Sequence, residues 1–290
     1  MASTRQIKSR MSTAGNISKI TKAMEMVSAS KMRRAQQRAV AARPYTRAIQ
    51  ESLQKVALFT DPTLHPLLSH HKTGKNVLVL FSTDRGLCGG LNTNLFKNSW
   101  AWSKSHKDVE VIVVGKKAVT FARRMGFTIL AQFTDLPETL SLADILPISA
   151  VVTQGFLSQE FKSVYLIHMD FINTLSQKVK VTQLLPLSKD IAKLDEGVVK
   201  PQIYLEYTFE PNAQEILNEL LPYYLENTLY QTLLEAKASE HSARMVAMKN
   251  ASDNAKDLVG ELKLLFNKLR QAAITNELLD ITTATMTVNK

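Results

Sequence analysis

The chain has 290 residues, of which 45% are apolar, and this content excludes a wholly disordered protein. A single cysteine, Cys88, excludes a disulfide framework and a cysteine-based zinc site. No run of about 18 uncharged apolar residues occurs, so the sequence predicts no membrane-spanning helix.

The formal net charge of +10 is concentrated at the N-terminus. Residues 1–47 hold eleven Lys and Arg and one acid, Glu25, whereas the rest of the chain holds 25 basic and 25 acidic residues. Such a segment indicates an acidic partner: nucleic acid, anionic lipid or an acidic protein loop. A solvated helix face is the alternative, but such faces usually mix signs. A transit peptide would have a similar composition, but this stretch runs without a break into a patterned helix.

The N-terminal segment predicts one long helix. Its first forty residues alone would reach about 60 Å, wider than most globular domains. Apolar residues recur at steps of three or four, a helical stripe that resumes after Pro44. The stripe consists of Ile7, Met11, Ala14, Ile17, Ile20, Met24 and Val27, then Ile49, Leu53 and Val56.

The C-terminal segment predicts a second long helix, because after Pro222 it contains no proline and only one glycine, Gly260. It would reach about 100 Å, and the two terminal helices are expected to pair antiparallel. Its predicted seam is small or polar at Ala236, Ala243, Ala247, Asn250 and Asn254, and then apolar at Leu258, Leu262, Leu265, Leu269 and Ala272.

The middle of the chain predicts a buried, largely parallel sheet covered by helices. Helical stretches around 91–106, 116–125 and 141–160 lie between short apolar runs rich in β-branched residues. The charged stretch 186–200 predicts a mobile loop. The expected strands are 76–82, 109–115, 162–169 and 203–209.

The string FSTDRGLCGGLNTNLF (81–96) follows a strand and opens a helix, where doubly wound sheets bind ligands. Its glycines could expose backbone N–H groups to a phosphate, which leaves a nucleotide-dependent enzyme as one interpretation. The string matches neither phosphate-binding signature. We therefore favour a tight turn in which Asp84 and Arg85 pair with each other or cap the helix.

Other reactive side chains form no convincing set. Cys88 could be a nucleophile with His106 or His168 as its base, but a free cysteine is more often a small buried side chain. Asp170 and Asp190 have no partner carboxylate at a defined spacing. A loop with three histidines and no nearby carboxylate is a weak metal site, and an exposed connector is favoured. These histidines are His65, His70 and His71. No catalytic, cofactor-binding or metal-binding residues are predicted.

The terminal helices carry the stronger signal, a polar stripe beside an apolar seam in each of ITKAMEMVSASKMRRAQ (20–36), KASEHSARMVAMKNASDNA (237–255) and FNKLRQAAITNE (266–277). Together with STDRGLCGGLN and FINTLSQ (171–177), these strings resemble the γ subunit of the F-type rotary ATP synthase, in order and over nearly the whole chain. The implied fold is an α/β protein with a long antiparallel coiled coil of N- and C-terminal helices and an inserted Rossmann-like α/β domain. The implied domains are a shaft helix at 1–58, a foot at 75–210 and a second shaft helix at 211–290.

This resemblance implies a non-catalytic rotor shaft without a cofactor. The shaft would turn inside the α3β3 hexamer, with its foot against the ε subunit and the c-ring, and couple proton-driven rotation to ATP synthesis or hydrolysis on β. With no presequence before the helix, we expect a peripheral protein on the cytoplasmic face of a bacterial inner membrane.

The resemblance also implies partner-contact residues. Met24 and the basic Lys19, Lys22, Arg33 and Arg34 would face the acidic lever region of β. Near the top of the shaft, the α/β loops would meet Arg244, Arg270, Gln271, Thr275 and Glu277.

Two features depart from the family. The segment LLDITTATMTVNK (278–290) stands where the family ends in a run like EIVGGA, so the contacts of the tip are open. The single cysteine excludes the cysteine pair of the chloroplast form. An alternative function is a nucleic-acid-binding α/β protein with a basic helical arm. Residues 1–44 contain no aromatic side chain to stack on bases, which disfavours it.

Overall fold

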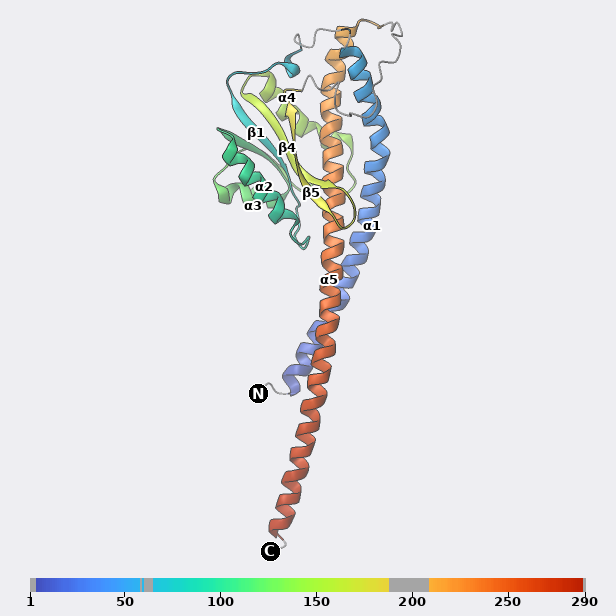
Figure 1. The fold of residues 1–290 in the computed structure, drawn as a ribbon, viewed down its shortest axis with the longest axis vertical. Helices are drawn as coiled ribbons and strands as arrows, with labels where there is room; N and C mark the ends of the chain where they lie inside the picture. Colours follow the sequence, from blue (N-terminus) through green and yellow to red (C-terminus); the bar gives the residue numbers. More distant parts are fainter. Residues whose placement is uncertain (1–3, 58, 60–64, 188–208, 289–290) are drawn as a thin grey trace. The chain divides into compact units, whose positions relative to one another are not determined.

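A computed structural model describes residues 4–57, 59, 65–187 and 209–288. The chain divides into two compact units, residues 1–29 with 244–290 and residues 30–243. Two helices contribute to both units, α1 (Thr4–Ala57) and α5 (Ala213–Val288) (Figure 1). The two expected long helices are thus confirmed, and they continue through Pro44 and Pro222.

The second unit contains a five-stranded sheet in the order β3-β2-β1-β4-β5. Neighbouring strands are parallel except for β4 and β5, so the expected largely parallel sheet is confirmed. Three expected strands correspond to β1, β2 and β4. The expected strand at 203–209, except for its last residue, and most of the expected loop at 186–200 lie outside the described residues. The strands are β1 (Lys75–Phe81), β2 (Val109–Val114), β3 (Thr128–Phe133), β4 (Phe161–Phe171) and β5 (Gln177–Leu185).

The sheet has a different helical layer on each face, and successive strand residues alternate between them. On one face Leu78 and Leu80 of β1 pack with α2 (Leu91–Ser105) and α3 (Lys116–Met125). On the other, Val77 and Val79 pack with α4 (Leu146–Leu157) and with the parts of α1 and α5 in this unit (Figure 1). Short 3₁₀ turns, η2 (Pro66–Leu68) and η3 (Leu142–Asp144), complete the unit.

Within this unit, α1 and α5 run antiparallel. Tyr45 of α1 meets Tyr223 of α5 through their hydroxyls and an edge-to-face ring contact at 6.1 Å. Earlier in α1, Ala35 lines the same hollow as Leu234 and His241 of α5. Residue numbers therefore rise along one helix as they fall along the other. The predicted core positions Ile49, Leu53 and Val56 are buried.

In the first unit, the predicted stripe on α1 is only partly right. Ile7 and Ala14 are buried, but Ile17 (47%), Ile20 (60%) and Val27 (54%) are exposed. Further along α1, small hydroxyl side chains take the buried positions, because closely approaching helices leave little room there for larger side chains. The buried hydroxyl residues are Ser18 and Ser28.

The predicted seam of α5 is displaced in the same way. Asn250, Asn254, Leu258, Leu265 and Ala272 are exposed, so the prediction is wrong at these positions. The seam lies further around the helix, and its members alternate by four and three residues as a coiled-coil seam requires. They are the buried Met248, Ser252 and Ala255 and the half-buried Val259, Leu262, Phe266 and Leu269.

Candidate partner-binding surfaces

The glycine-containing string after β1 caps a neighbouring helix. The Oγ of Ser82 accepts a hydrogen bond from the backbone N–H of Ala118 at 2.8 Å, and Asp84 Oδ1 accepts one from Lys116 N–H at 3.0 Å. The serine hydroxyl and the aspartate carboxylate thus satisfy backbone N–H groups in the first turn of α3. A Cβ on Gly115 would lie 2.5 Å from the carbonyl oxygen of Ser82, so the loops after β1 and β2 are in close contact. The expected tight turn with a capping role is confirmed for Asp84, although the capped helix is α3 and not α2.

Cys88 is buried, as expected of a small apolar side chain. The amide of Asn92 donates to its Sγ at 3.4 Å and to Thr83 Oγ1 at 2.8 Å. Of the two suggested bases, His106 stacks on Trp102 with ring centroids 3.9 Å apart. The environment of Cys88 is that of a structural thiol.

The three-histidine loop is not the exposed connector that the sequence predicts. His65 is buried and its Nδ1 accepts from Leu67 N–H at 3.1 Å, which caps η2, while burial lowers the pKa of its imidazole. His71 stacks on Phe156, with centroids 4.3 Å apart. Only His70 is exposed. His65 and His71 are covered by residues that are distant in the sequence, so the spacing of the histidines does not predict their burial.

Glu138 joins both long helices to the α/β part of the second unit. Its Oε1 lies 2.7 Å from His241 Nε2 of α5, and its Oε2 lies 3.1 Å from Lys31 Nζ of α1. Burial acts to raise the pKa of Glu138, but the charges of His241, Lys31 and Lys237 outweigh it, so that this pKa lies below its ordinary value. These side chains line a hollow of about 70 Å³, and Arg34 and Arg38 line it as well. The sequence pattern does not indicate this cluster, because its members are far apart in the chain.

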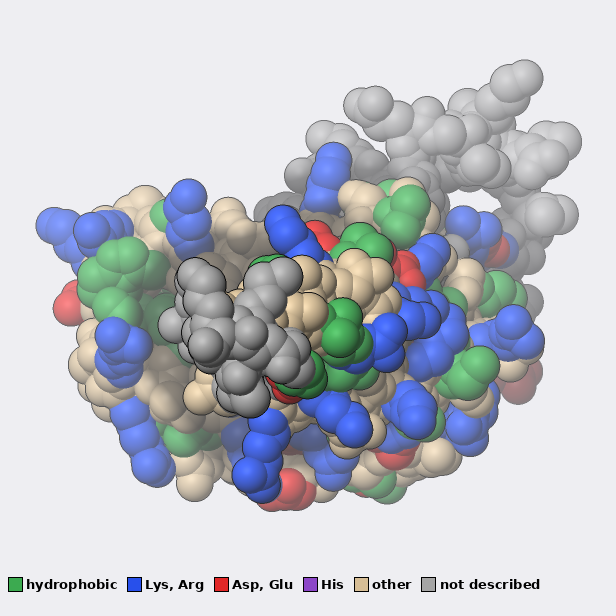
Figure 2. Space-filling model, turned by 90° about the horizontal axis from the view of Figure 1, so that it is seen from below, with side chains coloured by type: hydrophobic (Ala, Val, Ile, Leu, Met, Phe, Trp, Pro, Cys, Tyr) green, Lys and Arg blue, Asp and Glu red, His purple; other side chains and the backbone are tan. Residues whose placement is uncertain are grey.

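The expected basic contact residues of α1 lie at the surface. Lys19 and Lys22 are exposed in the first unit and Met24 is half-buried, while Arg33 and Arg34 are exposed in the second unit. Lys22 is paired with Glu25 at 3.0 Å, so part of its charge is balanced within the helix. On the face drawn in Figure 2, Lys and Arg side chains are interspersed with hydrophobic ones and acidic side chains are sparse.

The expected contact residues of α5 are exposed with one exception. Arg244 is only 9% exposed. No residue of α5 from 256 to 283 is buried among those described, although this stretch is rich in leucine. Large apolar side chains left open in this way mark a surface that a partner covers. The expected contact residues that are exposed are Arg270, Gln271, Thr275 and Glu277, and the exposed apolar residues include Leu264, Leu278, Leu279 and Ile281.

Comparison with known proteins identifies the family. A family model described as ATP synthase matches residues 3–288. An ATP synthase gamma chain of Glaesserella parasuis is 43% identical over 97% of this chain and 98% of that protein. The chain belongs to the ATP synthase gamma chain family. An ATP synthase gamma chain of Legionella pneumophila is 39% identical with the same coverage of both chains.

Solved structures agree with this family. A chain from the central stalk and c-ring of the Tetrahymena thermophila mitochondrial ATP synthase is 25% identical, with a TM-score of 0.61, over 80% of this chain and 99% of that one. A chain of the Euglena gracilis mitochondrial ATP synthase has the same fold. It is 20% identical, with a TM-score of 0.64, over 98% of this gamma chain and 94% of that chain. None of these matches supports the nucleic-acid-binding alternative. In the described part of the chain, no helix is both long enough and apolar enough to cross a membrane.

Proposed function

We propose that this gamma chain is the central rotor shaft of an F-type ATP synthase. The paired helices α1 and α5 turn inside an α3β3 hexamer and carry torque between the membrane ring and the catalytic β subunits. The chain itself performs no chemistry. Membership of the gamma chain family supports this role.

The observation that carries the proposal is the exposed apolar stretch of α5. Leu278, Leu279 and Ile281 are between 58% and 61% exposed, and no residue from 256 to 283 is buried. A single helix with this surface is poorly stable in water unless a partner covers it. The ring of α and β subunits supplies such a sleeve, and the interspersed Arg270, Gln271, Thr275 and Glu277 offer polar contacts to its loops.

The basic helix α1 supplies the second contact. Its contact residues face acidic segments of β. The positive charges of α1 attract these segments without holding the shaft at one angular position. The contact residues are Lys19, Lys22 and Met24 in the first unit and Arg33 and Arg34 in the second. Arg244 of α5, which is 9% exposed, belongs with Arg270 to the set that meets the α/β loops. The α/β part of the second unit is the foot, which binds the ε subunit and the c-ring. The assembly is peripheral on the cytoplasmic face of a bacterial inner membrane.

Purification of the native complex tests this assignment. An affinity tag on the foot of this chain should recover three copies each of two nucleotide-binding subunits and one copy of this chain. The recovered complex should hydrolyse ATP, and the chain purified alone should not. Recovery of the chain alone, or with nucleic acid, from intact membranes would contradict the proposal.

A further inference from the structure

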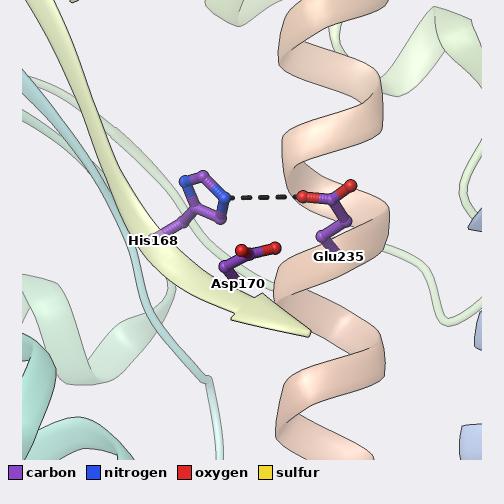
Figure 3. Close-up of side chains that lie close together, drawn as sticks. All are labelled: His168, Asp170 and Glu235. Atoms are coloured by element: carbon purple, nitrogen blue, oxygen red, sulfur yellow. Dashed lines mark ion pairs between the residues drawn. The ribbon is translucent and has the colours of Figure 1, made fainter. Parts of the chain in front are cut away.

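Three side chains with metal-binding groups converge in the second unit. His168 and Asp170 come from β4, and Glu235 comes from α5 (Figure 3). Residues two apart in a strand point to the same face, so both β4 side chains face the helix. One donor atom from each residue lies within 4.8 Å of the other two. The sequence offered Asp170 no carboxylate partner, whereas the fold brings Glu235 beside it.

His168 is the unusual member of this cluster. Its side chain is buried, the residue being 3% exposed, and neither ring nitrogen has a hydrogen-bond partner among the described residues. Its Nε2 lies 3.6 Å from Glu235 Oε2, which is too long for a hydrogen bond. A buried polar group without a partner is unfavourable, and native structures rarely keep one without a reason. A ligand between the imidazole and the carboxylate would remove this cost.

The spacing suits a metal ion. Zn²⁺ binds nitrogen and carboxylate oxygen at about 2.0–2.2 Å, so tetrahedral ligand atoms lie about 3.3–3.6 Å apart. The pair of His168 and Glu235 already has this separation. Asp170 is half-buried, and a carboxylate oxygen of Asp170 lies within 4.8 Å of a donor atom of each of the other two residues.

The surroundings position the ligands and limit the affinity. Gln231 donates from Nε2 to Glu235 Oε1 at 2.9 Å, which leaves Oε2 facing His168 and orients the carboxylate as outer-shell partners of metal ligands do. Two basic residues of β5, Lys178 and Lys180, pair with Asp170 and His168 across the strands. Their positive charge opposes a cation, so we expect weaker binding than in a closed structural zinc site.

We propose that His168, Asp170 and Glu235 form a binding site for a first-row divalent cation of the Zn²⁺ class, which fastens β4 to α5. One imidazole and two carboxylates favour Zn²⁺ or Co²⁺ over Mg²⁺ and Ca²⁺, which prefer oxygen alone. A water molecule completes the coordination.

Calorimetric titration of the chelator-treated full chain with Zn²⁺ and with Mg²⁺ tests this site. We expect one saturable Zn²⁺ per chain, at least tenfold weaker Mg²⁺ binding, and a rise in the unfolding temperature with Zn²⁺. Asp170→Asn, at a half-exposed position, should fold and weaken Zn²⁺ binding at least tenfold, and His168→Gln should do the same. His106→Gln, which changes a histidine elsewhere in this unit, should bind as the unchanged chain does.

Co²⁺ provides a direct readout of the ligands. Its visible absorption should show a low-coordinate site in the unchanged chain, and this spectrum should be lost in Asp170→Asn. The proposal is overturned if no saturable Zn²⁺ binding occurs, if Mg²⁺ binds equally well, or if Asp170→Asn binds Zn²⁺ with unchanged affinity.

Discussion

Ser18 of α1 and Ser252 of α5 form a reciprocal pair, in which each hydroxyl donates to the backbone carbonyl of the other residue at 3.3 Å. Their two Oγ atoms are 3.5 Å apart, and both residues are buried. Such contacts require the two helices of the first unit to approach closely, which only small side chains allow. The pair therefore fixes the register of the helices without a large apolar core.

We predict that this serine pair is coupled and intolerant of bulk. Ser18→Ala and Ser252→Ala should each cost about 0.5–1.5 kcal/mol in the free energy of unfolding. The double variant should lose less than the two together, because the two hydroxyls also contact each other, with their Oγ atoms 3.5 Å apart, and either replacement alone already removes that contact. Ser252→Leu should cost more, about 1–3 kcal/mol, by overpacking the seam. Chemical denaturation followed by circular dichroism measures these values, and strict additivity of the two alanine variants would contradict the pairing.

Glu138→Gln should make the stability of the chain less dependent on acid pH. The folded-state pKa of Glu138 lies below its ordinary 4.5, so its contribution is complete above that value and disappears as the pH falls through the folded pKa. The variant should be less stable than the unchanged chain at neutral pH, and the difference should shrink as the solution is acidified below pH 4.5.

Asp135→Asn is the matched control for Glu138. The carboxylate of Asp135 pairs with Lys116 at 2.7 Å, but both side chains are largely exposed, and such pairs contribute little. Unfolding temperatures recorded across the acid range separate the two variants. An equal loss in both at neutral pH would show that the contacts of Glu138 to His241 and Lys31 do not stabilise the unit.

Two glycines should respond in opposite directions to the same substitution. Gly115 has φ of +94° and no room for a Cβ beside the Ser82 carbonyl. Gly115→Ala should therefore lower the free energy of unfolding by about 1–3 kcal/mol. Gly260 lies in α5 with nothing within 4 Å of its Cβ position, so Gly260→Ala should stabilise by about 0.5–1 kcal/mol. Thermal unfolding of both variants checks the signs, and a stable Gly115→Ala chain would contradict the described contact of the two loops.

Replacing Lys19, Lys22, Arg33 and Arg34 together by Gln should impair coupling without preventing assembly. Exposed ion pairs contribute only about 0–1 kcal/mol each and salt screens them, so the complex should still form. Lys22 should matter least, because Glu25 already balances it. Proton pumping per ATP hydrolysed in membrane vesicles should fall.

A fourfold change of exposed lysines on the α/β part provides the control for these charges. Lys72, Lys97, Lys107 and Lys162 are all exposed, and their replacement by Gln removes the same charge. These lysines lie on the foot, which is not proposed to face β, so their loss should change pumping per ATP less than the change on α1 does. Equal pumping by both fourfold variants would argue against a specific role for the basic residues of α1.

Much of the fold follows from pattern, and the errors have a common cause. Strands such as β1 are continuous apolar runs, so their burial is visible in the sequence. The strands β3 and β5 were missed because edge strands alternate polar and apolar residues and have only one covered face. The predicted seam was misplaced because Ser18 is buried beside the more hydrophobic Ile17, and because Ser252 is buried between the predicted seam positions Asn250 and Asn254. A hydrophobic pattern shows which side chains are unfavourable in water, but not which of them the chain itself buries. On these helices part of the apolar surface stays exposed and is available to a partner.

The side-chain clusters could be predicted even less. The basic residues of α1 are visible as a charge excess, and their exposure agrees with that. By contrast, the contacts of Glu138 with Lys31 and His241 join residues about 100 positions apart, and those of His168 with Glu235 join a strand to a distant helix. Such contacts depend on the register between elements, which local periodicity does not determine.

Rotation of this chain within its complex tests the rotor account most directly. Cys88 is buried, so Lys107→Cys provides one exposed attachment point on the foot for a probe when the α3β3 ring is fixed to a surface. On addition of ATP we expect the probe to turn in one direction with three pauses in each revolution. A probe that stays at a fixed angle while the same complex hydrolyses ATP would contradict the account.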